Sequence, residues 1–161
     1  MSTWTNADGI EVVFGTARSA LAENGTAIGY QTKTLVVDLD SQNLPALADA
    51  VSEKESSLPA NALITEAYLV ATSAWVGTGT LTVGLGYDNA GTPTAVDADG
   101  IDAAVDVDTV LAATGDVVAC DGALVDKTAT IGANRAWVYA VATGTVSAGT
   151  GKLYLTYIEV V

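Results

Sequence analysis

Hydrophobic and polar residues alternate along several segments of the chain. The alternation is clearest in TLTVGLGY (80–87), where threonine and glycine share one face and the other face carries Leu81, Val83, Leu85 and Tyr87. A period of two residues is the period of a β-strand, whose successive side chains point to opposite faces of the sheet. The segment is therefore predicted to form a strand with one buried face.

The segment KTLVVDLD (33–40) repeats this pattern. Its apolar residues at odd positions are predicted to point inward, and among its even positions only Val36 is apolar. Further strands are predicted at 10–14, 63–72, 116–120, 136–143 and 152–161. Seven strands separated by Gly, Asn, Asp and Ser turns predict an all-β fold, an antiparallel β-sandwich.

Two segments rich in glycine and threonine are interpreted as turns. The uncharged run 67–87 is long enough to suggest a membrane span, but its SAWVGTGTLTVGLG stretch favours two strands joined by a turn. The SAGTGKL segment (147–153) resembles the end of a phosphate-binding loop. Val146 and Leu153 stand where that motif needs Gly and Ser or Thr, and a strand follows instead of a helix. A hairpin turn is predicted there.

Two other segments favour short helices. PALADAVSEK (45–54) begins with proline and has helical spacing, although it is equally compatible with a loop leading to a turn at Pro59 and Asn61. DGIDAAVDVDTVLAATG (99–115) contains an apolar stripe and ends at Gly115. The members of that stripe are Ile101, Ala104, Val105, Val110 and Leu111. The prediction is thus a sandwich with one or two short helical insertions.

The chain has 161 residues, which is the size of one domain, and a formal net charge of -13. Residues 1–15 are predicted to form an N-terminal arm and first strand, and residues 16–161 a single β-sandwich domain. Nucleic acid and anionic membranes are not expected partners, because their affinity for proteins depends mainly on Lys and Arg. A strong negative charge suits a protein that meets a basic surface.

The sequence contains no histidine, which excludes the Ser-His-Asp triad and every His-ligated metal site. Cys120 is the single cysteine and lies in an apolar segment flanked by acids, which favours a buried, inert thiol. No serine-nucleophile or dinucleotide-binding motif occurs. The chain is therefore predicted not to be an enzyme and to need no cofactor.

Five carboxylates lie within DADGIDAAVDVD (97–108). An EF-hand beginning at Asp97 is excluded, because the positions that bend its loop and provide its bidentate glutamate do not match. A calcium site of another kind, built from Asp97, Asp99 and Asp102, stays open beside the alternative of a solvated loop and helix N-terminus. A glycosidase pair is disfavoured, because no aromatic residue lies near these carboxylates in the sequence.

The three tryptophans differ in their surroundings. Trp75 and Trp137 lie in or beside apolar strands, where burial is the expected fate, although a sugar-stacking platform in a carbohydrate-binding or adhesion module is an alternative. Trp4 stands in a short polar arm and is predicted to anchor the arm on a neighbouring chain.

The chain resembles small structural proteins of tailed-phage virions, in particular the head decoration or cement proteins of marine and cyanobacterial phages. The resemblance rests on STWTNADGIEVVFG, SLPANALITEAYLVAT, TLTVGLGYDNAGTPTAVDADGIDAAV and ATIGANRAWVYAVATGTVSAGTGKLYLTYIEVV. Together these segments cover most of the chain, and each is a packing pattern instead of a chemical signature.

This resemblance implies a jelly-roll-like sandwich that forms a homotrimer on the outer surface of the head and bridges major capsid protein subunits. It also implies that the N-terminal arm contacts the capsid or a sister subunit. The candidate contact residues are Trp4, Ile10, Val12 and Phe14. A head fibre or tail component of similar fold is an alternative.

Overall fold

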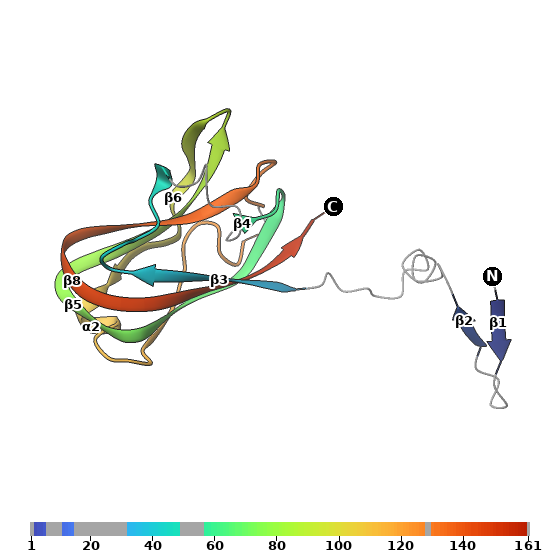
Figure 1. The fold of residues 1–161 in the computed structure, drawn as a ribbon, viewed down its shortest axis with the longest axis horizontal. Helices are drawn as coiled ribbons and strands as arrows, with labels where there is room; N and C mark the ends of the chain where they lie inside the picture. The colour runs from blue at the N-terminus through green and yellow to red at the C-terminus, as the bar shows by residue number, and fades with distance from the viewer. Residues whose placement is uncertain (1, 6–10, 15–31, 49–56, 128–129, 161) are drawn as a thin grey trace. The chain divides into compact units, whose positions relative to one another are not determined.

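The computed structural model describes residues 2–5, 11–14, 32–48, 57–127 and 130–160 (Figure 1). The chain divides into two compact units, Met1–Gln31 and Thr32–Val161. The first unit includes the residues 1–15 that the sequence predicts as an arm and first strand. It contains an antiparallel pair of strands, β1 (Ser2–Thr5) and β2 (Glu11–Phe14).

The second unit is a six-stranded antiparallel sheet in which four strands follow the order β3-β8-β5-β6. The strands β4 and β7 pair with β8 and β5 respectively. The elements are β3 (Lys33–Asp40), β4 (Ser57–Leu58), β5 (Ala62–Asn89), β6 (Thr92–Asp106), α2 (Val107–Val110), β7 (Val117–Ala119) and β8 (Ala136–Glu159).

Two strands are far longer than the rest. β5 has 28 residues and β8 has 24, and the two pair with each other from Ala62↔Glu159 to Gly86↔Trp137. The first half of β5 and the second half of β8 lie between β3 and β7, whereas their other halves lie between β4 and β6. The long pair curves over midway, so one hydrogen-bonded sheet forms both layers of the sandwich (Figure 1). The predicted all-β sandwich fold is confirmed.

Glycine makes this bend possible. The ladder between β5 and β8 shifts register several times between Ala71 and Gly77. Gly77 has φ +150°, and a Cβ atom placed on it would lie 1.9 Å from the carbonyl oxygen of Thr145 on the facing strand. Gly149 has φ +133°, and a Cβ atom there would lie 2.5 Å from Cγ of Trp75. At the bend the two backbones, and the indole, therefore occupy the space that side chains fill elsewhere.

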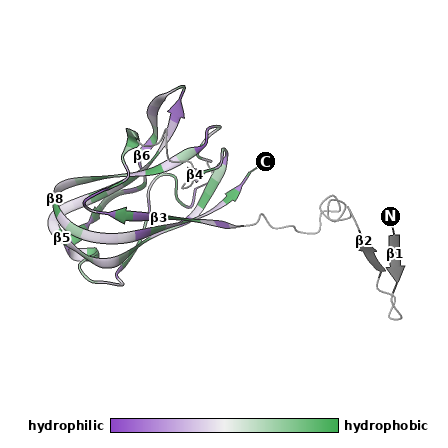
Figure 2. Ribbon diagram, viewed as in Figure 1, coloured by the Kyte–Doolittle hydropathy of each residue, from purple (hydrophilic) through white to green (hydrophobic). Residues whose placement is uncertain are grey.

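The core lies between the two layers and consists mainly of leucine, valine, isoleucine and alanine. Its largest fully buried side chains include Leu39, Leu58, Ile64, Leu69, Leu81, Leu85, Ile101, Leu111, Leu153 and Leu155. Hydrophobic and hydrophilic residues alternate along β3, as the colours in Figure 2 show. In agreement with the sequence pattern, Val37 and Leu39 are buried and Val36 is exposed.

The two predicted turns are wrong. SAWVGTGT lies within β5 and SAGTGKL lies within β8, and the two segments face each other across the bend. Glycine and threonine were interpreted as signals that the strands end. Here they let two paired strands curve without losing their partner. The turn predicted at Pro59 and Asn61 is confirmed, since Ala62 N donates to Pro59 O and Asn61 has φ +58°.

The predicted helix over 99–115 is largely wrong. Residues up to Asp106 belong to β6, and only Val107–Val110 are helical. The ladder between β5 and β6 pairs Leu81 with Val105 and Val83 with Asp102, so β6 has one extra residue. This β-bulge places Asp102 and Val105, which are three residues apart, on one buried face, and that spacing is also typical of a helix. The helix proposed at 45–54 lies partly outside the described residues.

In the part of the chain that the structure describes, no helix is long and apolar enough to cross a membrane.

Candidate interaction surfaces

The N-terminal hairpin carries the predicted contact residues. Trp4 pairs with Val12, and Ser2 pairs with Phe14, so Trp4, Val12 and Phe14 lie in one small antiparallel ladder. Trp4 therefore has a local backbone partner that its polar sequence surroundings did not predict. Ile10 lies outside the described residues, as do the side chains of the whole hairpin.

The carboxylate-rich segment forms a wide bulge in β6. Leu85 pairs with Asp97 and Val83 with Asp102, so the four residues between Asp97 and Asp102 face Gly84 alone. A Cβ atom on Gly84 would lie 2.4 Å from the carbonyl oxygen of Ala98, so glycine is needed there. The segment that follows β7 covers the bulge, because Gly122 N donates to Ile101 O and Leu124 N donates to Gly100 O.

Asp102 is the buried carboxylate of this segment, with 8% of its surface exposed. Its Oδ1 accepts a hydrogen bond from Ala104 N at 3.2 Å. Burial raises the pKa of Asp102 above its usual range. Burial, followed by the neighbouring charge of Asp102, raises the pKa of Cys120 to about 12. The thiol is thus protonated at neutral pH and poorly nucleophilic, as the sequence predicted.

Asp97 and Asp99 lie beside each other. Asp99 N donates to Asp97 Oδ1 at 3.4 Å, and burial and the Asp99 carboxyl raise the pKa of Asp97. Burial raises the pKa of Tyr139, and the negative charges of Asp97 and Asp99 raise it further. Among the described residues, no group of three or more His, Cys, Asp or Glu side chains is arranged to hold a metal ion. The three aspartates considered for calcium do not form such a group.

The two tryptophans of the sandwich are buried, as predicted. Trp75 is 2% exposed and Trp137 is 9% exposed, and within the described part of the chain neither indole nitrogen has a hydrogen-bond partner. A sugar ring stacks on an aromatic face that is open to solvent. These two side chains therefore do not form a stacking platform.

The outer face of the layer formed by β3, β8, β5 and β7 carries several apolar residues at outward positions. Two adjacent rows of outward residues cross its strands: Val36, Tyr154, Tyr68 and Ala119 in one row, and Asp38, Lys152, Val70 and Val117 in the next. We call the apolar members of these rows the apolar band: Val36, Tyr68, Val70, Val117, Ala119 and Tyr154.

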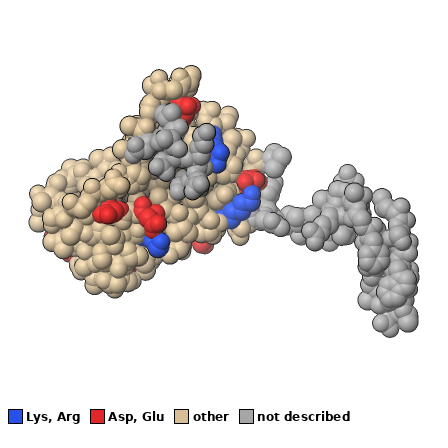
Figure 3. Space-filling view, in the orientation of Figure 1, with Lys and Arg blue, Asp and Glu red and all other residues tan. Residues whose placement is uncertain are grey.

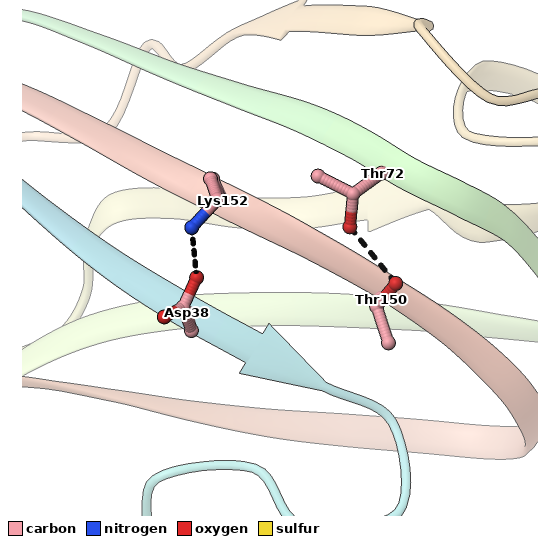
Figure 4. A network of polar contacts seen from close by, with 4 residues as sticks. All are labelled: Asp38, Thr72, Thr150 and Lys152. Atoms are coloured by element: carbon pink, nitrogen blue, oxygen red, sulfur yellow. Dashed lines mark hydrogen bonds and ion pairs between the residues drawn. The ribbon is translucent and has the colours of Figure 1, made fainter.

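Polar residues border the apolar band. Lys152 Nζ lies 2.5 Å from Asp38 Oδ1, and the Thr72 and Thr150 hydroxyls lie 2.8 Å apart; Figure 4 shows both pairs on β3, β5 and β8. Acidic and basic side chains also lie beside one another on the face seen in Figure 3, which is otherwise largely uncharged. An apolar centre with a polar border is the usual composition of a protein interface.

Sequence reasoning missed the apolar band. Val36, which is the one apolar residue at an even position of 33–40, belongs to the band. The other members lie on three different strands, and their proximity depends on register. The sequence signal for the band is that several predicted strands carry apolar or aromatic residues at positions that point outward.

No protein-family model and no curated protein matches the chain. Solved phage capsids, however, contain chains of the same fold. A chain in the capsid of Ralstonia phage GP4 aligns with a TM-score of 0.55 and 23% identity, over 85% of this chain and 88% of that chain. A chain in the acidic stable capsid of Helicobacter pylori bacteriophage KHP30 aligns with a TM-score of 0.52 and 14% identity, over 79% and 86%.

A third similar chain belongs to the cyanophage Pam1 capsid asymmetric unit. It aligns with a TM-score of 0.52 and 20% identity, over 97% of this chain and 98% of that chain. At such identities the likeness shows a shared fold. All three aligned chains come from phage capsids.

Proposed function

We propose that this chain is a structural virion protein that binds the outside of an assembled phage head as a decoration or cement protein. The observation that carries the proposal is the nearly complete alignment with a chain of the cyanophage Pam1 capsid, which spans 97% of one chain and 98% of the other. A fold that two chains share over their whole length supports a shared structural role more strongly than a fold that they share over one motif. No catalytic role is proposed.

The partners in this proposal are the major capsid protein and other copies of this chain, assembled as a homotrimer. The contact residues in this proposal are Trp4, Ile10, Val12 and Phe14, of which Trp4, Val12 and Phe14 lie in the β1–β2 ladder. A two-stranded hairpin with four-residue strands is marginally stable alone in water, so it gains from packing against a partner.

The proposed mechanism is thermodynamic. A protein that binds the assembled lattice but not free capsid subunits stabilises the lattice by mass action. The occupied head is then more stable than the bare head by an amount that grows with the concentration of the protein.

The test adds the purified full-length chain to phage heads that lack it. We expect the chain to sediment with the heads, to appear on their outer surface in a density map, and to raise their melting temperature. Heads that gain neither mass nor thermal stability would contradict the proposal. Density on a fibre or tail would replace it with the alternative role.

Sedimentation of the free protein tests the homotrimer separately. A mass three times that of the chain is expected, and a monomer at micromolar concentration would contradict it.

A further inference from the structure

We infer that the apolar band is the surface by which this chain docks on a protein partner whose own surface is apolar and bordered by Lys and Arg. The inference rests on the proposed function and identifies the face of the sandwich that meets the lattice. Three observations support it: the exposure of the band, the charges around it and its size.

The exposure of the band is the first observation. Val36, Tyr68 and Val117 are 43%, 40% and 59% exposed and lie on three strands of one layer. Single exposed apolar residues are ordinary, but a contiguous set with a polar border marks an interaction surface. On the other layer the exposed Val141 pairs with a threonine, Thr82, and provides an internal comparison.

The charges around the band identify its occupant. Lys152 is paired with Asp38 inside the second row, so it offers no net charge to a partner. The two rows of outward residues that flank the band contain exposed carboxylates: Glu66 on one side and Asp40 on the other. A second copy docked on this face would bring like charges together in a chain of net charge -13, which is unfavourable. A partner with basic residues around an apolar centre complements both features.

The size of the band indicates a repeated partner. Each outward position occupies about 4.8 Å by about 7 Å, so the six positions of the band cover roughly 200 Å². A stable protein interface buries about 800 Å² on each partner. The band is therefore one contact among several, and strong binding requires several copies to engage a repeating surface together. An assembled head provides such a surface, whereas a free capsid subunit does not.

The test compares three full-length proteins for binding to phage heads that lack this chain. The first is the unmodified chain, the second carries Val36→Thr and Val117→Thr, and the third carries Val141→Thr on the other layer. Valine and threonine have nearly the same shape, so the substitutions remove apolar surface and leave the fold unchanged. Equal melting temperatures of the three free proteins verify this.

We expect the double variant to bind heads at least tenfold more weakly than the unmodified chain, and the Val141→Thr control to remain within twofold. Affinity should also fall as NaCl rises, and Asp40→Asn with Glu66→Gln should reduce that salt dependence.

Each other outcome has a distinct meaning. If the unmodified chain binds heads and the double variant binds equally well, the docking face is wrong and the proposed function stands. If the double variant changes the oligomeric state of the free protein, the band is a contact between copies and the inference is overturned. If the unmodified chain does not bind heads, the proposed function fails, and the inference fails with it.

Discussion

The bend between the two layers and the hairpin between β5 and β6 both depend on glycine, but they change the direction of the chain differently. In the hairpin, Ala90 and Gly91 have φ +52° and +88°, and the next strand runs back antiparallel beside β5. In the bend, Gly77 and Gly149 have φ +150° and +133°, and each strand continues beside the partner it already had.

The surroundings of the glycines explain the difference. A Cβ atom on Gly91 would have no atom within 4 Å, so this glycine serves only the backbone conformation. A Cβ atom on Gly77 would meet the facing backbone at 1.9 Å. A glycine in a tight turn thus supplies a backbone conformation, whereas a glycine in a paired bend also makes room for the neighbouring strand. The following predictions test this comparison, from the largest expected effect to the smallest.

Gly77→Ala should cause the largest loss. The new methyl group must displace the Thr145 carbonyl from the ladder, and the residue must keep a positive φ. We expect the free energy of unfolding to fall by about 3 kcal/mol or more. Urea unfolding measures it, and Thr78→Ala at the adjacent exposed position is the control, with an expected loss below about 1 kcal/mol. Similar losses in both variants would contradict the close approach at Gly77.

Gly149→Ala should be destabilising mainly because its methyl group meets the Trp75 indole. Removing the indole, including its Cγ and Cδ2 atoms, with Trp75→Ala should reduce the cost of Gly149→Ala. A double-mutant cycle in urea should give a coupling energy of about 1–3 kcal/mol. Strict additivity would show that the strained φ of residue 149 or the backbone of Trp75, and not the indole, requires glycine.

Gly91→Ala should lower the free energy of unfolding by about 1 kcal/mol, because the only penalty for alanine there is the left-handed backbone conformation. Asparagine tolerates that conformation better, so Gly91→Asn should cost less than Gly91→Ala. Thermal unfolding of the two variants measures this order. A loss at Gly91 as large as the loss at Gly77 would remove the distinction between turn and bend.

The β6 bulge interrupts a ladder without any glycine at positive φ, and Asp102→Asn tests what its buried carboxyl contributes. The raised pKa of Asp102 means that its contribution to stability is fully present below the unfolded-state pKa of about 3.9 and is lost as the pH rises through the folded-state pKa. Asparagine, which does not ionise, should therefore gain stability relative to aspartate between pH 3 and pH 7.

We expect that gain to be below about 1 kcal/mol, measured by urea unfolding at the two pH values. Asp40→Asn, at an exposed position, is the control for the general effect of removing one negative charge. A relative stability that does not change with pH would show that burial of Asp102 has no energetic consequence.

Strand positions were predictable because a strand with one buried face imposes a period of two, and β3 matches its predicted range of 33–40. Strand ends were less predictable. Whether glycine and threonine end a strand or bend it depends on the partner strand, and the partner of 73–79 lies some seventy residues further along the chain. In the same way, one extra residue in β6 brings Asp102 and Val105 to one face at a separation of three residues, which in a sequence is typical of a helix.

Candidate site residues were predictable only as far as local sequence determines burial. The apolar surroundings of Trp75, Trp137 and Cys120 predicted that they are buried, and each is. The apolar band was not predictable, because Tyr68 and Tyr154 are 86 positions apart and become neighbours only through the register of β5 and β8. Features that arise from one strand are visible in the sequence, and features that arise from register are not.

The continuity of β5 and β8 through both layers has a mechanical consequence. In a sandwich whose layers are joined by side-chain packing alone, a lateral force can make one layer slide over the other. Here the two layers share two backbones, which remain hydrogen-bonded to each other through most of the bend. A load applied to one layer passes to the other through covalent bonds and through backbone hydrogen bonds that are loaded in shear. The two layers therefore resist sliding past each other.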